Sequence, residues 1–251
     1  MDKWFNGEIA LITGGSSGIG RATALAFAAL GAKVVIADRN ESAETVAQII
    51  AAGGDAAFVR ADVTKSAQVE ALVAQVIEKY GALNFAFNNA GIGGDAFVPL
   101  AKYSEVTWDE VIDINLKGVF LSMKYELPHL VETKGAIVNM ASVAGLVGGR
   151  VGSAYYASKH GVVGLTKAAA LEYADKGVRI NAVAPAVIRT PMAERAFFHD
   201  PALTARVTGL HPLGRVGVPE EVASAVVWLC SKAASFTTGH TLPVDGGFLI
   251  P

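Results

Sequence analysis

The chain has 251 residues, of which 52% are hydrophobic and 18% charged, and its formal net charge is −2. This balance is typical of strands covered on both faces by helices, and a chain of this length can bury a large core. The small negative charge excludes the basic field that nucleic-acid binding requires. The single cysteine, Cys230, excludes an intramolecular disulfide, and without a Cys/His cluster we expect no metal site.

The beginning of the chain and its longest apolar runs bear on location. Residues 1–7 lack the continuous apolar stretch of a signal peptide. No run reaches the roughly 18 apolar residues needed to span a bilayer. We therefore expect a cytoplasmic protein without a membrane partner, folded as a single domain over residues 1–251.

The predicted elements alternate between strand and helix along the whole chain. Strands are expected at residues 9–12, 33–37, 56–60, 83–87, 136–140, 178–183 and 241–244. Helices are expected at residues 22–30, 41–52, 66–80, 104–127, 153–175 and 219–231, with Pro128 ending the fourth. Strict alternation implies right-handed crossovers and an α/β fold: a Rossmann-type, doubly wound parallel sheet of about seven strands with helices on both faces.

A glycine-rich run from Thr13 to Gly20 follows the first predicted strand and predicts a dinucleotide site. Glycines there let the backbone approach a pyrophosphate, whose charge is stabilised by the N–H groups at the start of the next helix. Asp38 closes the second predicted strand, where a carboxylate accepts hydrogen bonds from a ribose and repels a 2′-phosphate. Arg39 can tolerate that phosphate, whereas Ser17 adds no basic residue to the turn. We expect NAD, with NADP as the second choice.

Tyr155 and Lys159 are spaced by four residues in a predicted helix, which places them on the same face. A phenol has a pKa near ~10 and is a poor base at neutral pH, but an adjacent ammonium lowers its pKa. Tyr155 can then act as a general base toward an alcohol or a general acid toward a ketone. Ser142, at the polar end of a predicted strand, can hold the reacting oxygen or simply cap the strand. Asn115, in a predicted helix, can order a water or be purely structural.

These motifs resemble those of the compact, single-domain short-chain dehydrogenase/reductase family, and the resemblance covers nearly the whole chain. The run from Thr13 to Gly20 is similar to the family's cofactor turn, and residues 88–91, Asn-Asn-Ala-Gly, to its sheet-stabilising motif. The family's catalytic tetrad is matched by Asn115, Ser142, Tyr155 and Lys159. At residues 185 and 186 the family usually has Pro-Gly, whereas this chain has Pro-Ala. A positive φ at Ala186 would strain the backbone.

The resemblance also implies which residues bind the cofactor. Asp62 and Val63 match positions that contact adenine, and Ile188 and Thr190 match positions that bind the nicotinamide carboxamide. The complete expected set is Gly14, Ser16, Ser17, Gly18, Ile19, Gly20, Asp38, Arg39, Asp62, Val63, Asn89, Ala90, Gly91, Tyr155, Lys159, Ile188 and Thr190. The family further implies a homotetramer, with the predicted helices at 104–127 and 153–175 as interfaces.

Two other segments bear on the substrate. Residues 190–218 are long for a connection, and we expect a helical lid that closes over the substrate and excludes water. Residues 143–152 are small and apolar, which favours an uncharged hydrophobic substrate. Arg150 in this loop can meet a carboxylate or a thioester carrier, or remain solvated.

The leading hypothesis is an NAD(H)-dependent oxidoreductase that interconverts an apolar secondary alcohol and its ketone. One alternative is reduction of a 3-ketoacyl thioester with NADPH, a task that benefits from basic residues for an acidic carrier. The other is a dinucleotide-sensing protein without turnover, which would not need the complete tetrad. A comparison of NAD(H) with NADP(H) distinguishes the alcohol oxidoreductase from the thioester reductase. An assay for turnover distinguishes both enzymes from the sensing protein.

Overall fold

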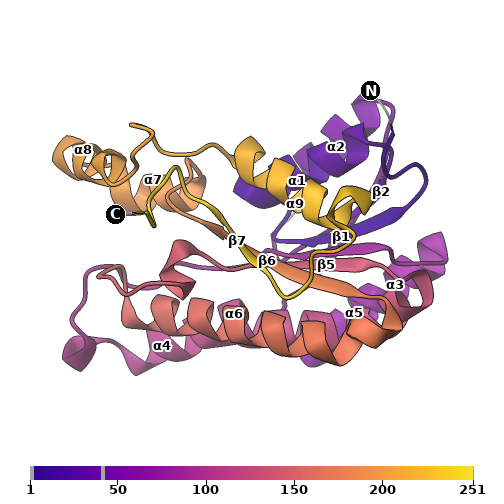
Figure 1. The fold of residues 1–251 in the computed structure, drawn as a ribbon, viewed down its shortest axis with the longest axis horizontal. Helices are drawn as coiled ribbons and strands as arrows, with labels where there is room; N and C mark the ends of the chain where they lie inside the picture. Colours follow the sequence, from indigo (N-terminus) through magenta and orange to yellow (C-terminus); the bar gives the residue numbers. More distant parts are fainter. Residues whose placement is uncertain (1–2, 41–42, 251) are drawn as a thin grey trace.

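The computed structural model describes residues 3–40 and 43–250, and its strands form one seven-stranded sheet in the order β3-β2-β1-β4-β5-β6-β7 (Figure 1). All neighbouring strands are parallel, which confirms the predicted Rossmann-type sheet. The strands are β1 (Ile9–Thr13), β2 (Lys33–Asp38), β3 (Asp55–Arg60), β4 (Phe85–Asn88), β5 (Ala136–Met140), β6 (Arg179–Pro185) and β7 (Thr241–Val244). Because the strand order reverses between β1 and β4, a crevice forms beyond their carboxyl ends.

Helices cover both faces of the sheet, with α1, α2 and α9 on one side and α3, α5 and α6 on the other (Figure 1). Their bounds are α1 (Gly18–Ala29), α2 (Ala43–Ala51), α3 (Ser66–Tyr80), α4 (Glu105–Ile112), α5 (Gly118–Thr133), α6 (Ser153–Tyr173), α7 (Pro191–Phe197), α8 (Pro201–Gly209) and α9 (Pro219–Cys230). Neighbouring strand residues alternate between two apolar clusters, since successive side chains point to opposite faces. Leu11 packs toward α3, α5 and α6, while Ile12 packs toward α1 and α9.

The predicted helix at 104–127 is wrong in two respects. It is divided into α4 and α5 by a π-helical turn, Asp113–Lys117, and α5 continues through Pro128 to Thr133. Proline removes one hydrogen bond to the carbonyl four residues earlier, which belongs to Lys124. Pro128 and Lys124 are both exposed, so water can satisfy that carbonyl, while buried Leu127 and Leu130 continue the packing on the other face.

Most other boundaries lie within a few residues of their predicted places. The helix α1 begins at Gly18, inside the glycine-rich run, because the turn itself supplies the first helical residues. Residues 41 and 42, where the next predicted helix begins, lie outside the described part of the chain. Ala186 does not have the positive φ that would strain it: outside glycine, the described residues with positive φ are Phe97 and Lys134. Within residues 3–40 and 43–250, no helix is both long and apolar enough to cross a membrane.

Candidate active site

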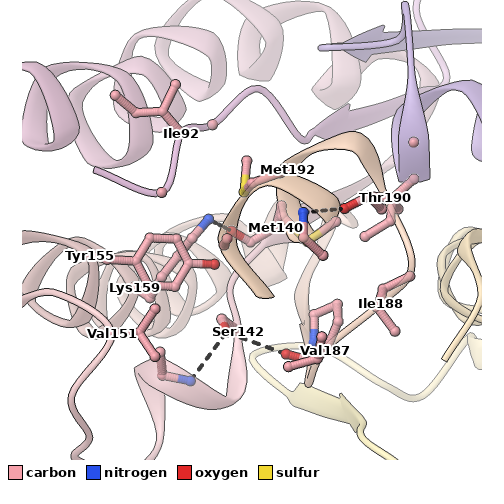
Figure 2. A pocket seen from close by; sticks show the side chains of 18 of the residues that line it. Ile92, Met140, Ser142, Val151, Tyr155, Lys159, Val187, Ile188, Thr190 and Met192 are labelled. Atoms are coloured by element: carbon pink, nitrogen blue, oxygen red, sulfur yellow. Dashed lines mark hydrogen bonds between the residues drawn. The ribbon is translucent and has the colours of Figure 1, made fainter. Parts of the chain in front are cut away.

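A cavity of about 720 Å³ opens beyond the carboxyl ends of the central strands (Figure 2). Most of the residues predicted from the sequence line it: Gly14, Ser17, Gly18, Ile19, Asp38, Arg39, Asp62, Val63, Asn89, Ala90, Gly91, Ser142, Tyr155, Lys159, Ile188 and Thr190. Three predicted residues, Ser16, Gly20 and Asn115, lie outside this lining. The cavity therefore gathers residues from all parts of the chain, from the first strand to the segment after β6.

The glycine turn is closely packed against the end of β4. A Cβ on Gly14, which has φ +67°, would lie 2.8 Å from Asn89 Nδ2, and one on Gly20 would overlap the carbonyl oxygen of Gly14. Asn89 Nδ2 donates to the carbonyl oxygens of Thr13 and Gly14, both at 3.0 Å. Ser17, the N-cap of α1, makes no side-chain cap hydrogen bond. The turn thus presents a glycine-rich cradle at a helix start, where Gly14 and Gly18 leave the backbone open to the cavity, and this fits the pyrophosphate of a dinucleotide.

Two carboxylates lie at the ends of β2 and β3. Asp38 accepts hydrogen bonds from the backbone N–H of Ser16 at 3.3 Å and of Asn40 at 3.1 Å, which holds it beside the glycine turn. Ser16 therefore positions Asp38 from outside the cavity lining. Burial raises the pKa of Asp62, but hydrogen bonds from Thr64 and nearby positive charge outweigh burial and keep it below the usual value. Both positions fit the adenosine end of a dinucleotide.

Lys159 and Tyr155 face the cavity from α6. Lys159 is only 3% exposed, and its Nζ donates to the carbonyl oxygen of Met140 at 2.7 Å. The same Nζ lies 5.5 Å from the ring centroid of Tyr155. Burial lowers the pKa of Lys159 to about 8. Figure 2 shows the Tyr155 hydroxyl directed into the pocket, so a molecule bound there can meet the phenol.

The lowered phenol pKa predicted from the sequence is not found for the protein on its own. Burial raises the pKa of Tyr155, and hydrogen bonding with Ser142 opposes this rise without overcoming it. The reason is physical: a buried phenolate loses solvation, while the ammonium of Lys159 is directed to the Met140 carbonyl. Only an additional positive charge in the cavity would favour the anion of Tyr155 further.

Ser142 acts as a local cap, one of the two roles considered for it, and its role in holding a reacting oxygen stays a prediction. Its Oγ accepts a hydrogen bond from Ala144 N at 3.2 Å and caps the short helical turn Val143–Gly145. The same Oγ donates to the carbonyl oxygen of Pro185 at 3.3 Å (Figure 2). This long bond is weak, so the hydroxyl hydrogen can turn toward an oxygen bound in the cavity.

Asn115 lies fully buried in the π-helical turn, behind the cavity wall. Its Oδ1 accepts from Ile92 N at 2.8 Å, and its Nδ2 donates to Ile92 O at 2.9 Å and to Ser158 Oγ at 3.3 Å. The amide therefore fixes the loop after Gly91. Its predicted role in ordering a water stays a prediction.

Sequence reasoning missed several groups that build the site. Thr13 Oγ1 accepts from the backbone N–H of Asn89 at 3.0 Å and of Ala90 at 3.2 Å, and so joins the glycine turn to β4. Its place at the head of the glycine motif was the available signal. The Met140 carbonyl that holds Lys159 had no signal, because any residue type carries this group. Phe97, which lines the cavity with an unusual backbone angle, had none either.

Comparison with known proteins agrees with this geometry. The family model described as enoyl-(acyl carrier protein) reductase matches residues 14–249. A 2,5-dichloro-2,5-cyclohexadiene-1,4-diol dehydrogenase from Sphingobium indicum is 47% identical over 97% of both chains. A cyclohexanol dehydrogenase from Acinetobacter sp. is 49% identical over 99% of this chain and 97% of the relative. A 3-oxoacyl-[acyl-carrier-protein] reductase from Thermotoga maritima is 41% identical over 97% of this chain and 98% of the relative.

Solved structures show the same architecture. The structure of levodione reductase has a TM-score of 0.91 at 40% identity and covers 97% of this chain, with 98% of its own chain matched. An Agrobacterium tumefaciens structure with bound NADP has a TM-score of 0.91 at 36% identity, with 99% of each chain covered. The chain belongs to the short-chain dehydrogenase/reductase family. Family members bind NAD or NADP, and the Agrobacterium tumefaciens structure holds NADP.

Proposed function

We propose that this protein oxidises an apolar cyclic secondary alcohol to its ketone, or reduces the ketone, with NAD(H) as the cofactor. The observation that carries the proposal is the Tyr155 hydroxyl in the cavity, with Ser142 in hydrogen-bonding reach and the Lys159 ammonium against its ring. Phenol, hydroxyl and ammonium are the groups that proton transfer to or from an alcohol oxygen requires. Membership of a family of dehydrogenases and reductases supports the same reaction.

The three side chains have separate tasks in this mechanism. During alcohol oxidation, Tyr155 accepts the hydroxyl proton, and during ketone reduction it returns that proton. Ser142 Oγ, released from its weak bond to Pro185, donates to the reacting oxygen and fixes its position. Lys159 is charged at neutral pH, since its pKa is about 8, and its charge stabilises the phenolate. A bound nicotinamide accepts or supplies the hydride.

One group supports NAD over NADP, and a second leaves NADP possible. Asp38 is held beside the glycine turn, where its charge repels a 2′-phosphate. Arg39 also lines the cavity and leaves NADP possible, as the second choice. Values of kcat/KM with each cofactor test the preference: NAD should be favoured, and a large preference for NADP would contradict this part of the proposal.

A cyclic substrate is supported by the cavity and by the relatives. Apolar residues line the cavity near Ser142 and Tyr155, among them Ile92, Val151 and Met192 (Figure 2), and three arginines, Arg150, Arg195 and Arg206, line it as well. The names of two relatives specify alcohols on six-membered carbon rings. The 3-oxoacyl-[acyl-carrier-protein] reductase relative keeps reduction of a 3-ketoacyl thioester as a second candidate. That reaction should show strong preference for NADPH and for acyl thioesters.

The assembly and location are part of the same proposal. We infer a homotetramer that uses the faces of α4, α5 and α6, where apolar side chains are exposed: Val106 is 78% exposed, Phe120 48% and Leu171 82%. Light scattering on the purified protein should give four times the chain mass, and a monomer would contradict the assembly. We also propose a cytoplasmic location, because NAD(H) is available there, and cell fractionation tests this location.

The central experiment is a panel of secondary alcohols and ketones, cyclic and open-chain, assayed with both cofactors by NADH or NADPH absorbance. Turnover of cyclohexanol or cyclohexanone with NAD(H) is the expected result. Binding of NADH without turnover of any compound would instead favour the dinucleotide-sensing alternative. Turnover limited to 3-ketoacyl thioesters would replace the proposed substrate class.

A further inference from the structure

Phe97, in the loop that follows β4, combines an unusual backbone with an exposed position. Its φ is +62°, a left-handed conformation that bulky L-residues rarely adopt. Its side chain is 52% exposed, so packing in the core does not account for this conformation. A backbone angle of this kind persists only where neighbouring structure imposes it, and such angles are concentrated at ligand sites.

Contacts hold the residues just before Phe97 in place. Asp95 N donates to the hydroxyl oxygen of Tyr103 at 3.1 Å. A Cβ on Gly94 would lie 2.6 Å from that hydroxyl oxygen, and a Cβ on Gly152 would lie 2.8 Å from the carbonyl oxygen of Asp95. The loop is therefore held between Tyr103 and the segment before α6. Phe97 lies two residues after Asp95 in this loop.

The Phe97 ring contacts the C-terminal end of α7. The rings of Phe97 and Phe197 have centroids 6.5 Å apart and an interplanar angle of 77°, an edge-to-face contact. Both residues line the cavity. At its other end, α7 is capped by Thr190, whose Cγ2 would lie 3.3 Å from a Cβ on Gly18. The helix thus extends from the cofactor turn to the aromatic pair, across the substrate end of the cavity.

We propose that Phe97 and Phe197 form an aromatic clamp that selects ring-shaped secondary alcohols over open-chain ones. This proposal rests on the proposed function, and it names Phe97 and Phe197 as the residues that select the substrate. A saturated ring presents broad C–H surfaces to the two aromatic rings and has few rotatable bonds to immobilise. An open-chain alcohol with the same number of carbon atoms loses more conformational freedom in the same space.

The test compares cyclohexanol with hexan-2-ol in the variants Phe97→Ala and Phe197→Ala and in the double variant. Each single variant should raise KM for cyclohexanol by roughly 10-fold and leave kcat within about twofold, because the contact contributes to binding rather than to proton transfer. KM for hexan-2-ol should change by less than about threefold. The double variant should be little worse than either single one, since each single variant already removes the edge-to-face contact that positions the two rings.

Controls keep the outcome interpretable. Phe236, which is fully exposed and does not line the cavity, gives the matched variant Phe236→Ala, and its KM values should be those of the wild type. Melting temperatures accompany every variant. Phe97→Gly removes the ring and also the backbone penalty, so it should melt at or above Phe97→Ala. A lower melting temperature for the glycine variant would contradict a left-handed conformation at residue 97. If an alanine or glycine variant at this position fails to fold, Phe97→Leu takes its place in the assay.

The results separate the clamp from the proposed function. Equal changes of KM for both alcohols, or no change for cyclohexanol, overturn the clamp. Turnover by the wild type would still support the proposed reaction in that case. No wild-type turnover of any secondary alcohol with either cofactor overturns the proposed function and the clamp with it.

Discussion

The interior holds two clusters of polar side chains that differ in what they face. The cavity cluster consists of Ser142, Tyr155 and Lys159, and it opens to a space that can hold a ligand. The closed cluster consists of Asn88, Glu126, Asn139 and Thr166, each 2% exposed or less. Polar groups are buried in both, so burial alone does not distinguish a reactive site from a structural one.

Within the closed cluster, side chains donate hydrogen bonds to one another. Asn88 Nδ2 donates to Glu126 Oε2 and to Asn139 Oδ1, both at 3.1 Å. Asn139 Nδ2 then donates to Thr166 Oγ1 at 3.0 Å. This chain of bonds joins β4 and β5 to α5 and α6. Asn89 and Met140, the next residues along these two strands, belong to the site, so the closed cluster supports the cavity from beneath.

Both clusters contain a group with a shifted pKa, so a shifted pKa does not distinguish them either. Burial lowers the pKa of Lys159 to about 8. Burial also raises the pKa of Glu126 to about 7, and the hydrogen bond from Asn88 opposes this rise. A shifted pKa therefore indicates a desolvated group, and access to the cavity decides whether that group can take part in chemistry.

The largest expected effect is on turnover, in the cavity cluster. Tyr155→Phe should reduce kcat by at least roughly 1,000-fold, because it removes the only atom assigned to proton transfer. NADH affinity, measured by fluorescence titration, should stay within about threefold of the wild type. Turnover near the wild-type level would remove Tyr155 from the mechanism.

Lys159→Met should reduce kcat by roughly 100-fold and yet leave the fold at least as stable. The folded protein disfavours the lysine cation, so the penalty is present below pH 8 and disappears as pH rises through 8 toward the ordinary value of 10.5. Urea unfolding at pH 7 checks stability, and steady-state kinetics check turnover. A strongly destabilised variant would mean that Lys159 has a structural task, like the members of the closed cluster.

Glu126→Gln should alter stability but not chemistry. Because the folded pKa of Glu126 is about 7, against an ordinary value of 4.5, its contribution to stability is complete below pH 4.5 and is lost as pH rises to 7. The glutamine variant should lack this loss, and its amide can donate to Asn88 Oδ1, which has no partner among the described residues. We expect a gain on the order of 1–3 kcal/mol at pH 8 and little change at pH 4.5.

Unfolding of the wild type and Glu126→Gln at both pH values provides the measurement. The same stability difference at pH 4.5 and pH 8 would show that the carboxyl does not titrate within the folded protein. A change in kcat beyond about threefold would mean that the two clusters are coupled rather than separate.

The smallest effect concerns cofactor choice at the rim of the cavity. Asp38→Ala should reduce the preference for NAD over NADP by roughly 10-fold, since it removes the charge that repels a 2′-phosphate. The ratio of kcat/KM for the two cofactors reports it, and Asp55→Ala, at the start of the neighbouring strand β3, serves as a matched control. An unchanged ratio would assign the preference elsewhere in the turn.

Much of the fold could be predicted because its signals are local. Apolar runs such as residues 136–140 and 241–244 match β5 and β7 residue for residue, and the glycine turn requires particular residues at particular places. The residues of the expected cofactor site lie at strand ends, which parallel strands bring to one edge of the sheet. Topology alone therefore gathers Asp38, Asp62 and Asn89 around the cavity.

What could not be predicted depends on packing between distant segments. Pro128 continues a helix because its exposed side faces water while Leu130 stays buried. The closed cluster needs Glu126 and Asn88 to meet across 38 positions of sequence. The raised pKa of Tyr155 arises from burial that no local spacing reveals. In the same way, the left-handed backbone of Phe97 lies in a loop held by Tyr103 and by the segment before α6, both distant in sequence from β4.

The pH dependence of the two reaction directions tests most directly whether the cavity phenol transfers the proton. Oxidation of cyclohexanol requires Tyr155 without its proton, and because burial raises the phenol's pKa, kcat/KM should increase with pH from 6 to 8, the range in which Lys159 keeps its charge. Reduction of cyclohexanone requires the protonated phenol, so its kcat/KM should be level at neutral pH and decrease at high pH. Parallel profiles in the two directions, or an oxidation rate that does not change with pH, would contradict the account.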